Sequence, residues 1–265
     1  MHDLYFQPVH EESQPRTEWS LSNAFTSAFK ELEPIPQYKA TTKIADFRST
    51  RRREVRCPLV HIARVARCES ACLQAAFREV YRWGFQTVDL DTILASTGVT
   101  KGALYYHFES KEALGYAIVE EVIAANLRDT WLRPLQRGED PIDALIGILR
   151  STSVRPEILR SGCPLNNLAI EMSALDDGFR KRLAMLFHEW QEGIAATLRE
   201  GQIHGKVRSD VEPDGTAGFL IAMYEGYILL AKNGRDPKVW EAGIRNIVGW
   251  LRSLRVPGNS READR

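Results

Sequence analysis

The apolar residues from residue 71 to residue 254 recur at helical spacing, and this periodicity limits the fold more than any other feature of the sequence. The first clear stripe runs from Leu73 to Tyr81 and stops at Gly84, a residue that adopts the left-handed conformation at helix ends easily. We find neither the alternation of polar and apolar residues that marks a half-buried strand nor an internal repeat. The pattern therefore predicts an all-α protein.

Three short helices are predicted at the start of this region. A second helix begins after Asp89, whose side chain is suited to capping, and a third begins after Thr100. Leu104 and Phe108 lie one turn apart on the third helix, so both point to the same core. This arrangement is typical of a helix-turn-helix domain, which we place at residues 71–116, with the motif at about 90–109.

Prolines and capping acids divide the rest of the chain into a longer helical body, which we place at residues 117–254. A connecting helix is expected from residue 111 to about residue 131. The further predicted helices cover residues 141–153, 164–175, 177–202, 213–233 and 237–254.

Both ends of the chain lack this periodicity. We predict that residues 1–68 form a poorly ordered extension, which need not belong to the native protein, and that 255–265 form a disordered tail. A stretch at 21–32 has the spacing of an isolated amphipathic helix. Residues 43–67 are rich in arginine, and this basic arm either reaches phosphates of a nucleic acid or is simply solvated.

The composition excludes several classes of protein. The 265 residues are 44% hydrophobic, which allows a packed core, and the 35 basic residues equal the 35 acidic ones, so any nucleic-acid surface must be local. No apolar stretch reaches the roughly 20 residues that span a bilayer, and the N-terminus lacks the pattern of a secretory signal. We therefore expect a cytoplasmic protein without a membrane partner.

The four cysteines do not form the framework of a disulfide-rich protein, which fits a reducing compartment. Cys57, His61, Cys68 and Cys72 could in principle hold zinc, but their spacing is wider than that of usual zinc sites, and ordinary thiols are favoured. The chain also lacks a Gly-rich phosphate loop, a Ser-His-Asp order and a His-Glu-x-x-His motif. We expect neither an enzyme nor a bound metal or cofactor.

The third helix carries the strongest functional pattern, because burying Leu104 and Phe108 leaves a distinctive free face. A helix in the major groove presents its first residues to base edges, where Lys101 can donate to guanine and Ala103 can contact a thymine methyl group. Gly102 permits close approach, and the nearby hydroxyl, imidazole and ammonium groups suit phosphates. The predicted DNA-binding residues are Thr100, Lys101, Gly102, Ala103, Tyr105, Tyr106, His107 and Lys111. The same face could alternatively be an aromatic patch for protein packing.

The run Thr-Lys-Gly-Ala-Leu-Tyr-Tyr-His-Phe at 100–108, with its flanking residues 93–99 and 110–114, closely resembles the TetR family of repressors. The resemblance extends over residues 71–254. It implies base reading by Lys101, Gly102 and Ala103, with phosphate contacts by Tyr105, Tyr106, His107 and Lys111. It also implies that Phe77, Ile93, Leu104 and Phe108 form the core of the helix-turn-helix domain, which we call the head. Asp89 stands where many members have Ser or Thr, and its charge would repel a phosphate.

A ligand-binding role for the body rests on the resemblance and on residue type. The segment 162–169 is similar to one that opens a pocket-lining helix in one branch of the family. The candidate ligand-binding residues are Trp131, Cys163, Asn167, Phe187, Trp190, Tyr224 and Tyr227. The same residues at helical spacing are also typical of a core. A thiol at a helix N-terminus has a lowered pKa, so Cys163 is additionally a candidate sensor of electrophiles or oxidants, although an inert buried thiol is favoured.

The last two predicted helices carry more apolar surface than one body needs, which favours a homodimer joined by a four-helix bundle. The sequence thus predicts a transcriptional repressor that binds double-stranded, near-palindromic operator DNA and is released by a small-molecule effector. Two alternatives stay open: a redox-sensing repressor that acts through Cys163, and a ligand-binding scaffold that no longer binds DNA.

Overall fold

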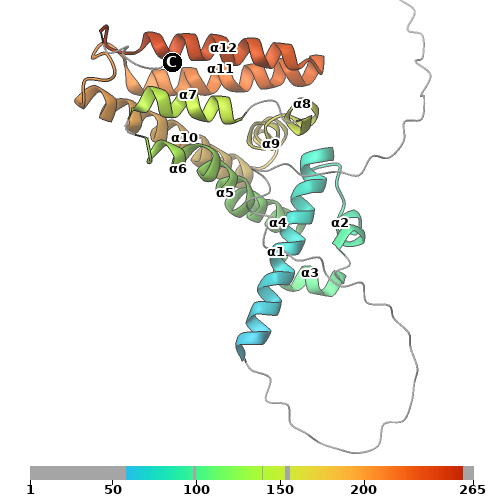
Figure 1. The fold of residues 1–265 in the computed structure, drawn as a ribbon. Helices are drawn as coiled ribbons and strands as arrows, with labels where there is room; N and C mark the ends of the chain where they lie inside the picture. The colour runs from blue at the N-terminus through green and yellow to red at the C-terminus, as the bar shows by residue number, and fades with distance from the viewer. Residues whose placement is uncertain (1–57, 98–99, 139, 153–155, 259–265) are drawn as a thin grey trace, which may run out of the picture. The chain divides into compact units, whose positions relative to one another are not determined.

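We describe the protein from a computed structural model, which describes residues 58–97, 100–138, 140–152 and 156–258 (Figure 1). The chain divides into two units, Met1–Glu54 and Val55–Arg265, and the description concerns the second one. The predicted amphipathic stretch at 21–32 and residues 43–57 of the predicted basic arm at 43–67, including Cys57, lie outside the described residues. The side chains of residues 58–69, 96, 97, 103, 156 and 157 lie outside them as well.

The three predicted head helices are present as α1 (Pro58–Trp83), α2 (Leu90–Thr97) and α3 (Lys101–His107). Helix α1 begins earlier than predicted, so residues 58–68 are helical and do not belong to an irregular extension. Proline is favoured at the first position of a helix, where its missing N–H has no partner to lose, and Pro58 occupies that position. Helix α1 ends as expected, because Gly84 adopts a φ of 87°.

The head has the predicted core. Phe77, Ile93, Leu104 and Phe108 are all buried, and they join α1, α2 and α3. Asp89 caps the start of α2 by accepting a 2.7 Å hydrogen bond from the backbone N–H of Thr92.

The connecting helix runs without a break from Lys111 to Leu135, which is about one turn longer than predicted. It consists of α4 (Lys111–Ala117), η1 (Ile118–Ile123), α5 (Ala124–Leu127), η2 (Arg128–Leu132) and α6 (Arg133–Leu135), where the η segments are widened π-helical turns. The backbone at each junction keeps right-handed helical angles. Ser110 caps its start by accepting a 3.1 Å hydrogen bond from the N–H of Ala113.

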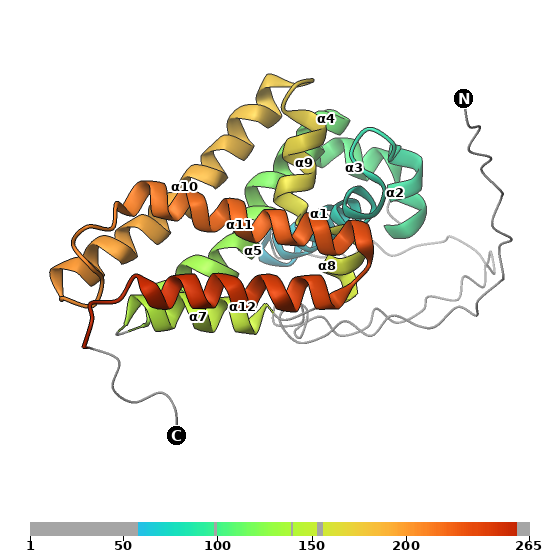
Figure 2. The ribbon, with the colours of Figure 1, turned by 90° about the horizontal axis from the view of Figure 1, so that it is seen from above.

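The described residues of the body form six further helices, and Figures 1 and 2 show α11 and α12 lying side by side. Helix α7 packs along α12, and α10 packs along α11. The bounds are α7 (Pro141–Ser151), α8 (Pro156–Ser161), α9 (Pro164–Met172), α10 (Asp177–Ile203), α11 (Pro213–Gly234) and α12 (Pro237–Ser253). Five of these lie within three residues of the predicted ranges, because acids cap their starts or prolines open them. The short α8 was missed.

The C-terminal end of the body reaches further than predicted. We expected a disordered tail from residue 255, but Arg255 donates to Asp140 at 2.9 Å and to Asp143 at 2.5 Å, and its backbone pairs with that of Val207. The Arg255 side chain is 17% exposed, so these ion pairs fix the chain against α7. Residues 259–265 lie outside the description. Among the described helices we find none that is both long and apolar enough to cross a bilayer.

Candidate nucleic-acid interface and ligand cavity

The outer face of α3 consists of side chains that the core does not need. Tyr106 is 78% exposed and Tyr105 is 44% exposed, although both are large aromatic residues. Leu104 and Phe108 anchor the opposite face of the helix, so the orientation of the outer face is fixed by the head core. The rings of Tyr106 and His107 meet edge to face at 5.3 Å, which holds the two side chains together at one end of this face.

Gly102 lies at the start of α3, and no atom of a described residue lies within 4 Å of the position that a Cβ would occupy there. Internal packing therefore gives no reason for a glycine at this residue. Its backbone angles are not in the left-handed region either. A glycine that faces open space allows an outside molecule to approach the helix backbone closely.

The ammonium group of Lys101 lies 3.5 Å from the carboxylate of Asp91 on α2, and the two side chains are 62% and 78% exposed. An ion pair this exposed contributes little to stability, so the lysine can exchange its partner for a base or a phosphate at low cost. Lys101 is therefore available for the predicted contact.

The other predicted DNA-contact residues are placed less uniformly. Lys111 donates to the carbonyl oxygen of Gln86 at 3.2 Å and lies 4.9 Å above the ring of Phe85, so it must leave these partners to reach a phosphate. Thr100 is exposed at the start of α3, and the side chain of Ala103 is outside the description. The backbone N–H of Thr92 lowers the pKa of Asp89, which keeps that side chain anionic.

Within the body, the aromatic side chains pack against one another. Trp131 contacts Trp190 at 4.9 Å and Tyr224 at 5.0 Å between ring centroids, and Tyr224 also contacts Trp240 at 5.4 Å. All four are buried. The indole N–H groups of Trp190 and Trp240 have no hydrogen-bond partner among the described residues.

A buried carboxylate lies beside Cys163. Glu225 of α11 is 7% exposed, and within the described structure neither of its oxygens accepts a hydrogen bond of good geometry. Burial raises the pKa of Glu225 to about 7, and the nearby Cys163 and Asn166 side chains offset this only in part. Burial and the charge of Glu225 likewise raise the pKa of Cys163 well above its usual range. Our prediction of a lowered pKa for Cys163 was wrong, because these effects outweigh the helix N-terminus.

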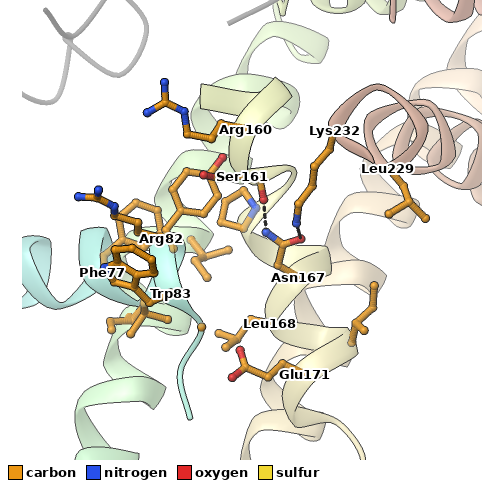
Figure 3. A pocket seen from close by; sticks show the side chains of 17 residues that line it. Phe77, Arg82, Trp83, Arg160, Ser161, Asn167, Leu168, Glu171, Leu229 and Lys232 are labelled. Carbon is orange, nitrogen blue, oxygen red and sulfur yellow. Dashed lines mark hydrogen bonds between the residues drawn. The ribbon is translucent and has the colours of Figure 1, made fainter. Parts of the chain in front are cut away.

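A cavity of about 680 Å³ lies where the head meets the body, between α1, η1, α8, α9 and α11 (Figure 3). Of the seven residues predicted to bind a ligand, Asn167 lines it. Trp131, Trp190 and Tyr224 belong to the aromatic cluster described above, and Phe187 stacks on Trp190 at 6.4 Å. The hydroxyl of Tyr227 accepts a hydrogen bond from Asn246 at 3.2 Å.

Helix α9 forms one wall of this cavity. Residues near both ends of α9 form hydrogen bonds with the C-terminal part of α1 and the residues that follow it. At its start, the carbonyl oxygen of Gly162 accepts a 2.5 Å hydrogen bond from Tyr81 of α1. Near its end, the carboxylate of Glu171 accepts the backbone N–H groups of Phe85 at 2.9 Å and Gln86 at 2.8 Å. A shift of α9 would therefore change the hydrogen bonds that hold the C-terminal end of α1.

Two glycines permit close contacts of α9 with α1 and of the segment before α9 with α11. A Cβ at Gly84 would lie 3.0 Å from an oxygen of Glu171, and one at Gly162 would lie 3.0 Å from the side chain of Lys232. Both residues have positive φ angles, which side chains disfavour. Nothing local in the sequence indicates that Glu171 accepts a hydrogen bond from an amide 85 residues away.

Comparison with known proteins accounts for both halves of this arrangement. Residues 73–118 match the model of the bacterial regulatory proteins of the tetR family, and residues 138–247 match a tetracyclin repressor-like C-terminal domain. The chain belongs to the TetR family. It is therefore a DNA-binding transcriptional regulator. The family resemblance of the segment that forms α3 is confirmed.

Curated TetR-family relatives align over most of their length. The transcriptional repressor DhaR from a Mycobacterium species is 33% identical over 160 residues, which cover 58% of this chain and 76% of DhaR. The regulator AcuR from Cereibacter sphaeroides is 30% identical over 167 residues, covering 60% of this chain and 74% of AcuR. A TetR regulator of known structure from Chloroflexus aurantiacus has a TM-score of 0.66 at 27% identity, with 73% of this chain and 98% of that one covered.

Members of this family bind operator DNA, act as dimers and respond to small-molecule effectors. They are generally regulators and not enzymes, which agrees with the lack of a catalytic motif in the sequence. In this TetR-family chain, the matched head segment contains α2 and α3, and the matched body segment contains α7 to α11.

Proposed function

We propose that the chain is a repressor that binds a near-palindromic operator as a homodimer and leaves it when a small molecule binds the body. The observation that carries the proposal is the exposed outer face of α3 around Gly102, where packing within the described residues gives no reason for a glycine. The name of the relative DhaR, a repressor, supports repression as the direction of control.

On this proposal, α3 enters the major groove with its first turn against the bases. Lys101 donates to guanine after leaving Asp91, and Gly102 and Ala103 let the helix lie close to the base edges. Tyr105, Tyr106 and His107 contact flanking phosphates, which fixes the position of the helix without reading sequence. Thr100 and Lys111 complete the phosphate contacts.

A homodimer is supported by an apolar stripe on α11 that the described part of one chain leaves exposed. Phe219 and Leu230 are exposed, and Ala222 and Gly226 lie between them at helical spacing with small side chains. A Cβ at Gly226 would meet no atom of the described part of the chain within 4 Å, so a second helix can approach there. Packing of α11 and α12 against their twofold mates would bury this stripe in a four-helix bundle.

The experiment is a titration of a labelled operator fragment with wild type, Lys101→Ala and Lys181→Ala. Lys181 is an exposed lysine of α10 and serves as a control that removes the same charge from the body. We expect Lys101→Ala to weaken binding by about 5- to 150-fold and to relax base preference, with Lys181→Ala close to wild type.

Two results would count against the proposal. Equal binding by all three proteins would show that Lys101 does not contact the operator. If the wild-type protein enriched no sequence from random DNA fragments, a ligand-binding scaffold would be favoured. Redox sensing through Cys163 is the weaker alternative, because a thiol with a raised pKa holds little of the reactive thiolate.

A further inference from the structure

We propose that the cavity between α1, α9 and α11 binds a small organic anion with an apolar or aromatic body, and that this anion is an effector. The inference rests on the proposed function, since it assigns a site and a ligand class to a ligand-responsive regulator. It differs from our prediction based on residue type, which pointed to the aromatic cluster around Trp190.

The size and walls of the cavity suit a ligand of this kind. Its volume of about 680 Å³ lies within the range of sites for small organic ligands. Aliphatic and aromatic side chains from four helical segments form much of its surface. They include Phe77 of α1, Ile118 and Ile123 of η1, Leu168 of α9 and Leu229 of α11. An apolar ligand body would be desolvated against these groups.

The charges in the cavity favour an anion. Among the described lining residues, Arg82, Arg160 and Lys232 contribute three basic groups and Glu171 contributes one carboxylate. Both oxygens of Glu171 already accept backbone N–H groups, so this carboxylate is committed to holding the end of α1. The basic groups therefore exceed the acidic ones at the site.

Lys232 is the basic group best placed to bind the charged end of a ligand. In Figure 3 its side chain points to Asn167, and within the described structure its ammonium makes one hydrogen bond, to the neutral side-chain oxygen of Asn167 at 3.2 Å. Arg82 lies 4.7 Å above the ring of Trp83 and makes no ion pair with a described residue. A carboxylate, sulfonate or phosphate could replace the amide oxygen at Lys232 and gain a charge-assisted bond.

Binding here would act on the contact between α1 and α9. Asn167 holds Lys232 with its oxygen and the carbonyl oxygen of Ser161 with its nitrogen. The next residue, Gly162, accepts the hydrogen bond from Tyr81 of α1. A ligand that breaks the hydrogen bond between Lys232 and Asn167 therefore disturbs the segment that contacts α1. To act as an effector, the ligand must bind one arrangement of the DNA-binding domain more tightly than the other.

The test uses two fluorescent probes of nearly the same shape, anionic anilinonaphthalenesulfonate and neutral N-phenylnaphthylamine. They are titrated into the full chain of wild type, Lys232→Met, Arg82→Gln and the control Lys238→Met, an exposed lysine at the start of α12. We expect the affinity for the sulfonate to fall about tenfold in Lys232→Met and severalfold in Arg82→Gln. The neutral probe should change by less than about twofold, and the control should match wild type in both titrations.

A second readout is the operator affinity at saturating sulfonate. We expect the anionic probe to weaken operator binding by wild type, and Lys232→Met to need about ten times more probe for the same effect. Sulfonate affinity that is unchanged in both variants, or that falls together with that of the neutral probe, would overturn the anion site. If operator affinity did not change when the sulfonate was bound, the role of the anion as an effector would be overturned. Failure of the probe-free protein to bind DNA would instead refute the proposed function, while the titrations without DNA would still test the cavity.

Discussion

The aromatic residues of α3 and those of the body show opposite uses of the same side chains. Tyr106 on α3 is 78% exposed, whereas Trp190 in the body is 2% exposed and contacts three other rings. Side chains such as Tyr106 contribute little to folding, so they are free to serve a partner. Trp190 and its neighbours form the core, so their burial and ring contacts stabilise the fold.

The largest effect expected from this comparison is on the free energy of unfolding. We expect Trp190→Ala to lower it by about 3–5 kcal/mol, because the substitution removes a fully buried indole and leaves a cavity. We expect Tyr106→Ala to change it by less than about 0.5 kcal/mol and to weaken operator binding instead. Urea unfolding at one protein concentration measures both. Comparable destabilisation by the two substitutions would contradict the division between partner-facing and core aromatics.

A second effect concerns the buried carboxylate beside this core. Glu225 has a pKa of about 7 in the folded chain and 4.5 as the ordinary value, so the folded state holds its proton between these pH values. Its contribution to stability is complete below pH 4.5 and is lost as pH rises to 7. We expect Glu225→Gln to abolish that loss, so that the variant exceeds wild type by about 3 kcal/mol above pH 7 and matches it below pH 4.5. Parallel stability curves for the two proteins across this range would show that Glu225 is not buried as described.

The smallest effect concerns the exposed face of the head. Asp91→Asn removes the exposed partner of Lys101 at 3.5 Å and one negative charge near the expected phosphates. We expect operator affinity to rise by about two- to fivefold, with the free energy of unfolding unchanged within about 0.5 kcal/mol. Titration of the same operator fragment at low salt measures the gain. A weaker complex would place Asp91 among the groups that bind DNA.

The head was predictable from the sequence because its determinants are local. Leu104 and Phe108 fix which face of α3 is buried, and Gly84 marks the end of α1 through its own backbone conformation. The helices of the body were predictable for the same reason, since Asp140, Asp176, Glu212 and Asp236 cap the starts that follow them.

The cavity was not predictable, because it depends on contacts between distant segments. Glu171 meets the amides of Phe85 and Gln86 only once α9 has packed beside α1, and Lys232 reaches Asn167 across 65 residues. Residue type pointed instead to Trp131, Trp190 and Tyr224, which the structure places in contact with one another. Aromatic residues at helical spacing fill a core as readily as they line a pocket.

The most direct test of DNA reading by α3 is the selection of random DNA fragments by the purified wild-type protein, followed by sequencing. We predict an enriched motif with two inverted half-sites, whose centres lie about one helical turn of DNA or a multiple of it apart. The same selection with Lys101→Ala should lose preference at one position in each half-site. Enrichment of no symmetric motif, or of an identical motif by both proteins, would contradict the account.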